Sequence, residues 1–257
     1  MSVDPDGRLA GSQQYDLQNG DHIVEARLDL GRETRKGVPE VIFAEGKTDG
    51  QVIDIVRVFV QRTGHAIVSR MSAELLGHLE RDFPEYSVDI RKPARAAAIR
   101  AHGYQIPRTG GRIAVLTAGT SDISVAEEAR LVAEEMGVET ETLYDVGVAG
   151  LHRLIGPLGA ILERGVSAIV VCAGMDGALP SVVAGLVPVP VIGIPVPSGY
   201  GAGGQGKAAL LSMLQTCAPG LAVVNIGNGV GGGAMAALIA NRVAEVERRL
   251  ADQPLNP

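Results

Sequence analysis

The stretch from Ile169 to Ala202 constrains the fold more than any other part of the chain. It contains two short apolar runs, Ile169–Val171 and Val191–Ile194, each bounded by turn residues. Such runs are typical of strands that are buried on both faces of a parallel sheet. The segment between them is rich in Ala, Val and Leu, with Pro180 near its start, where a helix tolerates proline. The stretch therefore predicts a strand–helix–strand unit.

Each of these two strands runs into a loop rich in glycine, Ala173–Ala178 and Pro195–Gly204. Both loops follow strands, so we expect them at the carboxyl end of the sheet, where open α/β sheets bind ligands. Glycine allows a ligand to approach the backbone closely. Ordinary connecting turns are the alternative interpretation of either loop.

Strands and helices alternate from Ile113 onward, which predicts a three-layer α/β fold with a parallel sheet and helices on both faces, Rossmann-like in type. Further expected strands are Ile113–Leu116, Glu139–Leu143 and Ala222–Ile226. Expected helices are Ser124–Met136 with Gly137 as its stop, Leu151–Leu162 kinked at Pro157, Lys207–Cys217, and a last helix through Leu250 that follows a glycine loop at Gly227–Gly233.

The first part of the chain predicts a smaller α/β unit. Its expected strands are 41–44, 66–69 and 86–90, and its expected helices are Thr48–Arg62 and Ser72–Arg81, with a short helix within Asp21–Leu30. We expect a disordered tail over residues 1–20, an N-terminal domain over 21–105, a linker at His102–Gly111 and a catalytic domain over 112–250.

Composition narrows the functional classes. The net charge of −6 argues against non-specific binding to nucleic acid. No apolar run of membrane-spanning length is free of Pro or Gly, and no secretory leader pattern opens the chain, so a cytoplasmic protein without a membrane partner is expected. Two cysteines and five scattered histidines suggest neither a disulfide framework nor a zinc site.

Two acidic residues lie on glycine-rich loops at the expected ligand end. Asp122 and Asp176 could orient a substrate hydroxyl or hold Mg²⁺ against phosphates, and a capping or turn carboxylate is an equal alternative. The segment Thr117–Asp122 leads from a strand into a helix, as an anion-binding cradle does, although Ser121 and Asp122 also fit plain capping residues. In the N-terminal part, a loop with Arg32, Arg35 and Lys36, followed by Lys47, could receive an anion or simply be solvated.

The two cysteines differ in their expected setting. Cys217 falls near the carboxyl end of a predicted helix, where the dipole opposes a thiolate, and a small buried hydrophobic residue is the simpler interpretation. Cys172 lies inside an apolar strand and fits the core better still.

Several strings resemble the aminoimidazole ribonucleotide (AIR) carboxylase family over about residues 112–243. They are Thr117–Asp122 (TAGTSD), Ala173–Pro180 (AGMDGALP), Pro190–Pro195 (PVIGIP) and the glycine-rich C-terminal segment. The resemblance implies a parallel α/β sandwich that assembles into octamers. The chain departs from the purine enzyme's pattern at Ala178, where that pattern has a histidine, and at Tyr144–Gly150, which lacks the second histidine.

A closer resemblance covers almost the whole chain. Val38–Thr48, Ala118–Glu128, Tyr144–Arg153, Gly174–Pro180 and Ala222–Asn228 are similar to the nickel-pincer cofactor biosynthesis carboxylase/hydrolase family, also called pyridinium-3,5-biscarboxylic acid mononucleotide synthase. This resemblance implies nicotinic acid adenine dinucleotide as substrate, CO₂ or bicarbonate as co-substrate, and carboxylation of the pyridinium ring with hydrolysis of the phosphoanhydride. It also implies that Cys217 is the nucleophile that forms a covalent adduct with the ring. Asp176 stands where relatives commonly carry Glu.

The resemblance extends to a set of site residues. Catalytic roles are expected for Cys217 and Asp176, with Asp176 also the expected ligand of a Mg²⁺ ion and no tightly bound organic cofactor. Substrate contacts are expected from Gly119, Thr120, Ser121, Asp122, Asp145, Gly174, Met175, Gly177, Ser198, Tyr200, Gly201, Asn225, Asn228, Gly229, Glu45 and Lys47. Two alternatives stay open: an AIR carboxylase or mutase of purine biosynthesis, and a non-catalytic nucleotide-binding protein.

Overall fold

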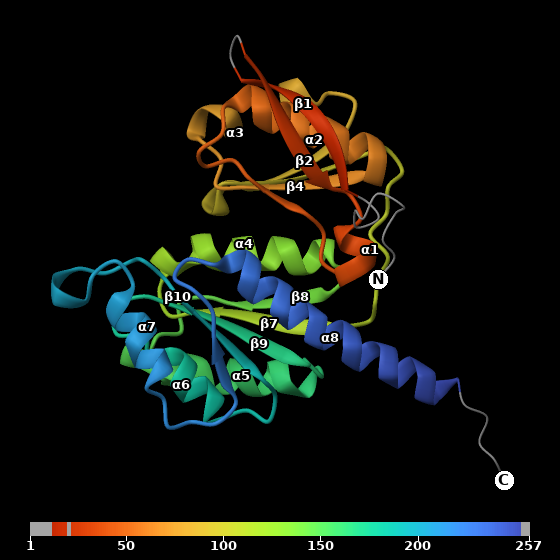
Figure 1. Cartoon of the computed structure of the whole chain (residues 1–257). Helices are drawn as coiled ribbons and strands as arrows, with labels where there is room; N and C mark the ends of the chain where they lie inside the picture. Colours follow the sequence, from red (N-terminus) through yellow and green to blue (C-terminus); the bar gives the residue numbers. More distant parts are fainter. Residues whose placement is uncertain (1–11, 20–21, 253–257) are drawn as a thin grey trace. The chain divides into compact units, whose positions relative to one another are not determined.

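The computed structural model describes residues 12–19 and 22–252, and the chain divides into two compact units, Met1–Gln105 and Ile106–Pro257. Each unit has its own sheet and its own helices, which Figure 1 colours in chain order. No helix in the described ranges is both long enough and apolar enough to cross a membrane.

The C-terminal unit is built on a five-stranded sheet in which every pairing is parallel, in the order β11-β10-β9-β7-β8. Its strands are β7 (Arg112–Thr117), β8 (Glu139–Leu143), β9 (Ala168–Ala173), β10 (Val191–Pro195) and β11 (Leu221–Val223). Strand β7 therefore lies inside the sheet, with β8 on one side of it and β9 on the other. This confirms the expected parallel α/β fold.

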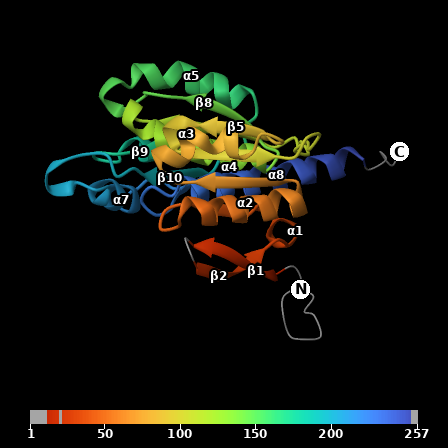
Figure 2. The same cartoon turned by 90° about the horizontal axis from the view of Figure 1, so that it is seen from above.

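Helices cover both faces of this sheet (Figures 1 and 2). They are α4 (Ile123–Glu135), α5 (His152–Glu163), α6 (Leu179–Ala184), α7 (Lys207–Leu214) and α8 (Gly229–Ala251), with 3₁₀ turns η2 (Thr120–Asp122), η3 (Val148–Gly150) and η4 (Gly201–Gly203). Helices α4 and α8 pack on each other and on one face. Side chains of α5, α6 and α7 share a core with Ala114 and Leu116 of β7 on the other face. Alternate residues of a strand point to opposite faces, which places Ile113 and Val115 on the α4 and α8 side.

The glycine run near the C-terminus is part of a helix, not of the open loop that its composition predicts. Asn228 is the N-cap, and its side-chain oxygen accepts a hydrogen bond from the amide of Gly231 at 2.8 Å. A Cβ at Gly233 would lie 2.2 Å from the carbonyl oxygen of Ala129 on α4. Close packing of α8 on α4 thus requires glycine here.

One other predicted boundary in this unit is corrected. Helix α7 ends at Leu214, so Cys217 lies beyond it in a turn, not inside the helix. Helix α5 continues through Pro157, and the kink expected there stays a prediction. By contrast, α4 ends before Gly137 as expected: this glycine has φ +79°, and a Cβ there would meet the carbonyl oxygen of Pro107 at 2.1 Å.

The N-terminal unit has a four-stranded sheet in the order β3-β4-β6-β5, with β3 and β4 parallel and the other pairings antiparallel. Its elements are β1 (Ser12–Asn19), β2 (His22–Asp29), α1 (Arg32–Lys36), β3 (Val41–Phe43), α2 (Asp49–Thr63), β4 (His65–Ser69), α3 (Ala73–Asp82), β5 (Ser87–Arg91), η1 (Lys92–Ala94) and β6 (Ala96–Arg100). Helices α2 and α3 bury their apolar faces in one core with residues of β3, β4 and β6. Thr48 begins α2 with a capping box that involves Gln51, and Ser72 caps α3.

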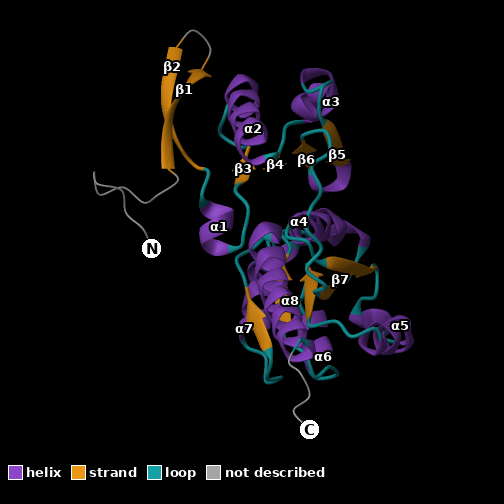
Figure 3. Ribbon diagram, turned by 90° about the vertical axis from the view of Figure 1, so that its right-hand side faces the viewer, coloured by secondary structure: helices purple, strands orange, loops and turns teal. Residues whose placement is uncertain are grey.

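The structure differs from the predictions for this unit at several places. Arg32–Lys36 form helix α1, where a charged loop was expected. Residues 12–19 and 22–29 pair as an antiparallel hairpin beside α2 (Figure 3), where a tail and a short helix were expected. The two residues between the paired Asn19 and His22 are Gly20-Asp21 in the sequence, a dipeptide typical of two-residue hairpin loops. Residues 1–11 and 20 of the expected tail lie outside the described residues. Strand β6 was not predicted, because its alanine-rich sequence has little β-propensity and gains its stability from pairing on both sides.

Candidate functional site

The strand order points to one crevice in the C-terminal unit. Chain connections leave β7 toward β8 on one side, and later strands build outward from β9 on the other. Ligands of open α/β sheets bind where this order switches, outside the carboxyl ends of the two strands concerned. Here these are β7 and β9, which are followed by Ala118–Asp122 and Gly174–Ala178. The cradle predicted at Thr117–Asp122 and the glycine-rich loop predicted at Ala173–Ala178 are therefore neighbours.

Asp122 joins the loops at this crevice. Only 2% of the residue is exposed, and its two carboxylate oxygens accept hydrogen bonds from the amide of Gly119 at 2.9 Å and the hydroxyl of Ser198 at 3.0 Å. The amide of Gly174 and the hydroxyl of Ser121 also favour its ionised form. Burial raises the pKa of Asp122, and these donors oppose the rise. Asp122 makes no side-chain cap bond to α4, but its bond from the Gly119 amide closes the 3₁₀ turn η2, so the capping interpretation is confirmed for that turn.

The loop after β9 is shaped by close backbone approach. A Cβ at Gly174 would lie 1.9 Å from the hydroxyl oxygen of Ser198, so no larger residue fits without a shift. The amide of Met175 donates to the carbonyl of Ser198 at 3.3 Å, and Met175 has φ +49°. A non-glycine residue in this region is uncommon and marks a locally constrained backbone. The loops after β9 and β10 thus hold each other through Ser198.

The loop after β8 lies against the same end of β7. The amide of Asp145 donates to the hydroxyl of Thr117 at 3.0 Å, and Asp145 has φ +58°. Arg153 donates to the Asp145 carboxylate at 2.8 Å and to its carbonyl oxygen at 2.6 Å. Arg153 is a site candidate that sequence reasoning missed. Arg153 is the last residue of the string Tyr144–Arg153, which carries the family resemblance, and this position could have identified it. Its bonds to Asp145 hold an exposed guanidinium at the crevice.

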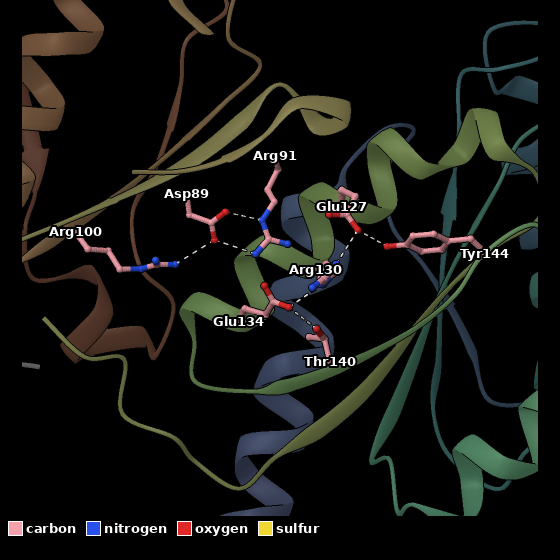
Figure 4. Close-up of polar contacts among 8 residues, drawn as sticks. All are labelled: Asp89, Arg91, Arg100, Glu127, Arg130, Glu134, Thr140 and Tyr144. Carbon is pink, nitrogen blue, oxygen red and sulfur yellow. Dashed lines mark hydrogen bonds and ion pairs between the residues drawn. The ribbon is translucent and has the colours of Figure 1, made fainter. Parts of the chain in front are cut away.

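Tyr144 belongs to a polar network between α4 and β8 (Figure 4). Its hydroxyl donates to Glu127, and Arg130 pairs with Glu127 at 3.2 Å and with Glu134 at 2.8 Å. Thr140 donates to Glu134 at 2.7 Å. Burial and the neighbouring Glu127 carboxylate raise the pKa of Tyr144 far above its usual range, so this phenol stays protonated and fastens β8 to α4.

The other expected contacts at the carboxyl end differ in exposure. Thr120, Ser121, Asp176, Tyr200 and Asn225 are exposed, whereas Gly177 and Gly229 are buried. Asp176 Oδ1 accepts from the amide of Ala178 at 3.3 Å, which leaves its other oxygen toward solvent. Within the described ranges no three His, Cys, Asp or Glu side chains gather as a metal cluster. Mg²⁺ often takes one or two carboxylates and completes its shell with phosphates and water, and a single Asp176 fits that pattern.

The start of α8 contributes backbone rather than free side chains. The side-chain oxygen of Asn228 is used by its cap bond, and that of Asn225 accepts from the amide of Ile226 at 2.9 Å. The Glu128 carboxylate accepts from the amide of Val230 at 3.2 Å. A Cβ at Gly229 would lie 2.5 Å from Glu128, so this glycine is required for packing. Substrate contacts by Asn225, Asn228, Gly201 and Gly229 stay predictions.

The two cysteines lie in opposite settings. Cys172 is fully buried in β9, and burial raises its pKa well above the usual value, so it is inert core. Cys217 is exposed, in the turn that precedes β11. Because it precedes a parallel strand, this turn lies at the amino end of the sheet, whereas the loops of the crevice lie at the carboxyl end. Within one chain, Cys217 and the crevice are therefore at opposite ends.

A cavity of about 450 Å³ lies at that amino end of the sheet, beside β7 and β8. Its lining includes Arg108, Gly111, Glu134 and Glu139. It contains none of the predicted site residues. Glu45 and Lys47 belong to the N-terminal unit, where Glu45 pairs with Arg70 at 3.3 Å and Lys47 donates to the carbonyl of Phe43 at 2.7 Å.

Comparison with known proteins follows the division of the chain. The family description "AIR carboxylase" matches residues 112–256, and "LarB/PurE-like N-terminal domain" matches residues 21–101. The chain is 43% identical over 232 residues to "Uncharacterized protein MJ0165" of Methanocaldococcus jannaschii, which covers 89% of each protein.

More distant relatives match about half of this chain. An N5-carboxyaminoimidazole ribonucleotide mutase of Pyrococcus abyssi is 31% identical over 53% of this chain and 75% of its own length. The mutase of Methanocaldococcus jannaschii is 34% identical over 45% of this chain and 68% of its own length. The sheet is parallel and its strand order switches between β7 and β9. The C-terminal and N-terminal family descriptions both match this chain. The chain belongs to the AIR carboxylase family, as a LarB-like protein that carries the LarB/PurE-like N-terminal domain.

Proposed function

We propose that this protein carboxylates the pyridinium ring of nicotinic acid adenine dinucleotide and hydrolyses its phosphoanhydride. The products are pyridinium-3,5-biscarboxylic acid mononucleotide and AMP, as in the first step of nickel-pincer nucleotide biosynthesis. The family supports a carboxylation-related enzyme, and the N-terminal domain match favours the LarB-like reaction over the purine one. The observation that carries the proposal is the exposed thiol of Cys217, the residue that the closer resemblance implies is the nucleophile.

The chemistry needs a nucleophile because a pyridinium carbon is electron-poor and does not attack CO₂. A thiolate adds to the ring carbon para to nitrogen, and the ring becomes a neutral dihydropyridine with an enamine. The neighbouring carbon then forms a bond to CO₂ with the enamine electron pair. Loss of the proton from that carbon and expulsion of the thiolate restore the aromatic ring. The net change replaces one ring hydrogen by a carboxylate and releases one proton.

The crevice between β7 and β9 would bind the substrate. Ser121 and the loop amides beside Asp122 would line the phosphates and ribose, since amide donors at a helix start suit anions. The guanidinium of Arg153 would pair with a phosphate, where a bidentate contact is strong. Asp176 would hold Mg²⁺ together with substrate phosphates, and the ion would neutralise charge on the phosphoanhydride during hydrolysis.

The position of Cys217 adds a requirement to this proposal. Because the thiol lies at the end of the sheet opposite to the crevice, a second copy of the chain has to supply it. Leu211 and Leu214 of α7, near Cys217, are 61% and 59% exposed. Large exposed apolar side chains are typical of surfaces that are covered in an assembly. We therefore propose a homo-oligomer, an octamer by resemblance, in which the Cys217 turn of one copy completes the crevice of another.

The direct test is an assay with nicotinic acid adenine dinucleotide, bicarbonate and Mg²⁺. The expected result is AMP together with a pyridine dicarboxylate mononucleotide, both identified by mass spectrometry. The Cys217→Ser variant should yield no carboxylated product, whereas the matched Cys172→Ala variant should retain turnover if it stays folded. Binding of the dinucleotide without turnover would instead indicate a non-catalytic nucleotide-binding protein.

The second candidate is N5-carboxyaminoimidazole ribonucleotide mutase, which the names of the more distant relatives favour. The residue before Leu179-Pro180 argues against it, since Ala178 has no proton to transfer where the purine enzymes' pattern has histidine. Incubation with N5-carboxyaminoimidazole ribonucleotide should leave that compound unchanged. Its conversion at an enzymatic rate would overturn the pyridinium proposal in favour of the mutase.

A further inference from the structure

The N-terminal unit contains a cavity of about 180 Å³ beside β3. Its apolar part is formed by Leu28 of β2 with Ile55 and Phe59 of α2. Charged residues stand at its border. The complete lining is Arg27, Leu28, Glu40, Val41, Ile42, Phe43, Lys47, Ile55 and Phe59. This combination of an apolar interior and a charged border is typical of small-molecule sites.

One wall of the cavity is the open edge of strand β3. Strand β3 lies at the end of its sheet and pairs only with β4. The amide of Ala44 donates to Ser69 at 2.8 Å, so Ala44 and Ile42 direct their peptide groups toward β4. Peptide groups alternate along a strand, so those of Val41 and Phe43 point to the open edge. These groups offer both donors and acceptors to a ligand.

Cations stand at one end of this edge. The ammonium of Lys47 donates to the outward carbonyl of Phe43 at 2.7 Å, and Lys47 makes no ion pair in the part of the chain that the structure describes. Arg27 lines the same cavity from β2. The guanidinium of Arg70 lies 5.3 Å from the ring centroid of Phe43, which is 39% exposed. Positive charge and an exposed aromatic ring thus meet at the carboxyl end of β3.

A buried acceptor stands at the other end. Glu40 Oε2 is buried and has no aligned hydrogen-bond donor, although Arg32 Nε lies 2.5 Å from it as an ion pair. Burial raises the pKa of Glu40. The ion pair with Arg32 compensates the charge of this oxygen but leaves it without an aligned donor, and a ligand amino group would supply one.

These features exclude an added peptide strand and favour a nucleotide. Strand β3 has only three residues, and Lys47 already occupies the Phe43 carbonyl, so a ladder with another strand is blocked. The volume is below the roughly 300–1,000 Å³ of pockets for drug-sized ligands, so a single ring system enters and the rest of the ligand lies outside. Glu40 and Phe43 are about 10 Å apart along the strand, which is comparable to the reach of a nucleoside monophosphate.

We propose that this cavity binds an adenylate group, with the purine ring over Ile55 and Phe59, its amino group toward Glu40 and its phosphate toward Lys47 and Arg27. The adenylate can be free AMP or the adenylate half of a dinucleotide, and the second source rests on the proposed function. In either case the N-terminal unit is a nucleotide-binding module in its own right.

The test measures binding of radiolabelled AMP to the full-length protein by equilibrium dialysis. We expect saturable binding that Lys47→Gln weakens about tenfold or more, the size expected for losing a charged contact. The matched control is Lys36→Gln, an exposed cation of α1 outside the cavity, which should bind AMP like the wild type. Inosine monophosphate, which lacks the amino group, should bind more weakly than AMP, and Glu40→Leu should remove that preference.

Absence of saturable AMP binding would overturn the proposal, as would equal affinity of the wild type and the Lys47→Gln variant. Repeating the titrations on Cys217→Ser separates this inference from the proposed function, because that variant is expected to lack carboxylation and to retain AMP binding. A Lys47-dependent affinity for nicotinic acid adenine dinucleotide identifies the adenylate half of the substrate. A Lys47-dependent affinity for AMP alone identifies the free nucleotide.

Discussion

The hydroxyl of Ser198 lies 3.0 Å from Oδ1 of Asp122, although 76 positions separate them in the chain. This bond joins the loop after β10 to the loop after β7, and the loop after β9 lies between them through Gly174. Among the described residues no cation pairs with this buried carboxylate, so it depends on such neutral donors. The geometry of the crevice is therefore set by three loops that share one carboxylate.

Removal of that hydroxyl should loosen the crevice. Ser198→Ala leaves Asp122 with fewer donors, and we expect a loss of about 1–3 kcal/mol in the free energy of unfolding. We also expect weaker substrate binding, because the loops after β7 and β10 lose their link. Urea unfolding and the KM for the dinucleotide measure the two effects. Ser198→Thr keeps the hydroxyl. If this variant recovers neither the free energy of unfolding nor the KM, the space available to the side chain matters more than its hydrogen bond to Asp122.

Two glycines of the C-terminal unit should respond oppositely to alanine. At Gly174 the added Cβ would lie 1.9 Å from Ser198 Oγ, so Gly174→Ala should displace the loop and lower both stability and turnover. At Gly159, inside α5, a Cβ meets nothing within 4 Å. Gly159→Ala should stabilise by up to about 1 kcal/mol through helix propensity. Thermal unfolding of the pair checks this, and equal melting temperatures would contradict it.

Thiol reactivity should divide the two cysteines. Cys217 is exposed and Cys172 is fully buried with a raised pKa, so iodoacetamide should label one thiol per native chain and two per urea-unfolded chain. Peptide mass spectrometry should place the native label on Cys217. Labelling that is slower in a stable oligomer than in dissociated chains would agree with a partner covering this turn. Native labelling of Cys172 would contradict the described core.

Acid should remove the contribution of Asp89 to the N-terminal unit. Hydrogen bonds from Arg91 hold the pKa of Asp89 below its usual value, with burial opposing and Arg100 assisting (Figure 4). A carboxyl with a lowered folded-state pKa stabilises above its unfolded pKa, near 3.8, and that stability is lost as pH falls through the folded value. Wild type should therefore exceed Asp89→Asn in stability at neutral pH, and the difference should vanish in acid. Urea melts at several pH values measure it, and a pH-independent difference would refute it.

Much of the C-terminal fold follows from local sequence pattern. Apolar runs such as Ile113–Leu116 and Val191–Ile194 predict the strands, and Gly137 predicts the end of α4, because burial and backbone conformation are encoded by neighbouring residues. The glycine run Gly229–Gly233 misleads, since its purpose is close packing on α4, which only the folded structure reveals. Strand β6 is hidden for a similar reason: partners on both sides supply what its alanines lack.

The crevice is less predictable than the sheet. Glycine loops after β7 and β9 indicate where it lies, and Asp122 is identified as a candidate by its place in such a loop. The pairing of Arg153 with Asp145 depends on the left-handed backbone of Asp145 and on the turn that brings Arg153 back to it. Sequence spacing alone does not predict this conformation. The end of the sheet at which Cys217 lies depends on where α7 stops, and the prediction extended that helix by three residues.

The strand order also bears on how the protein is made. Within the C-terminal unit, strand β7 emerges from the ribosome first and can pair with β8 soon afterwards. Its other edge pairs with β9, where Ile113 meets Ala168. Until that segment is synthesised, an apolar strand edge stays open, and such edges attract other chains. Nascent chains truncated within α5 should therefore be the species that depends most on chaperones.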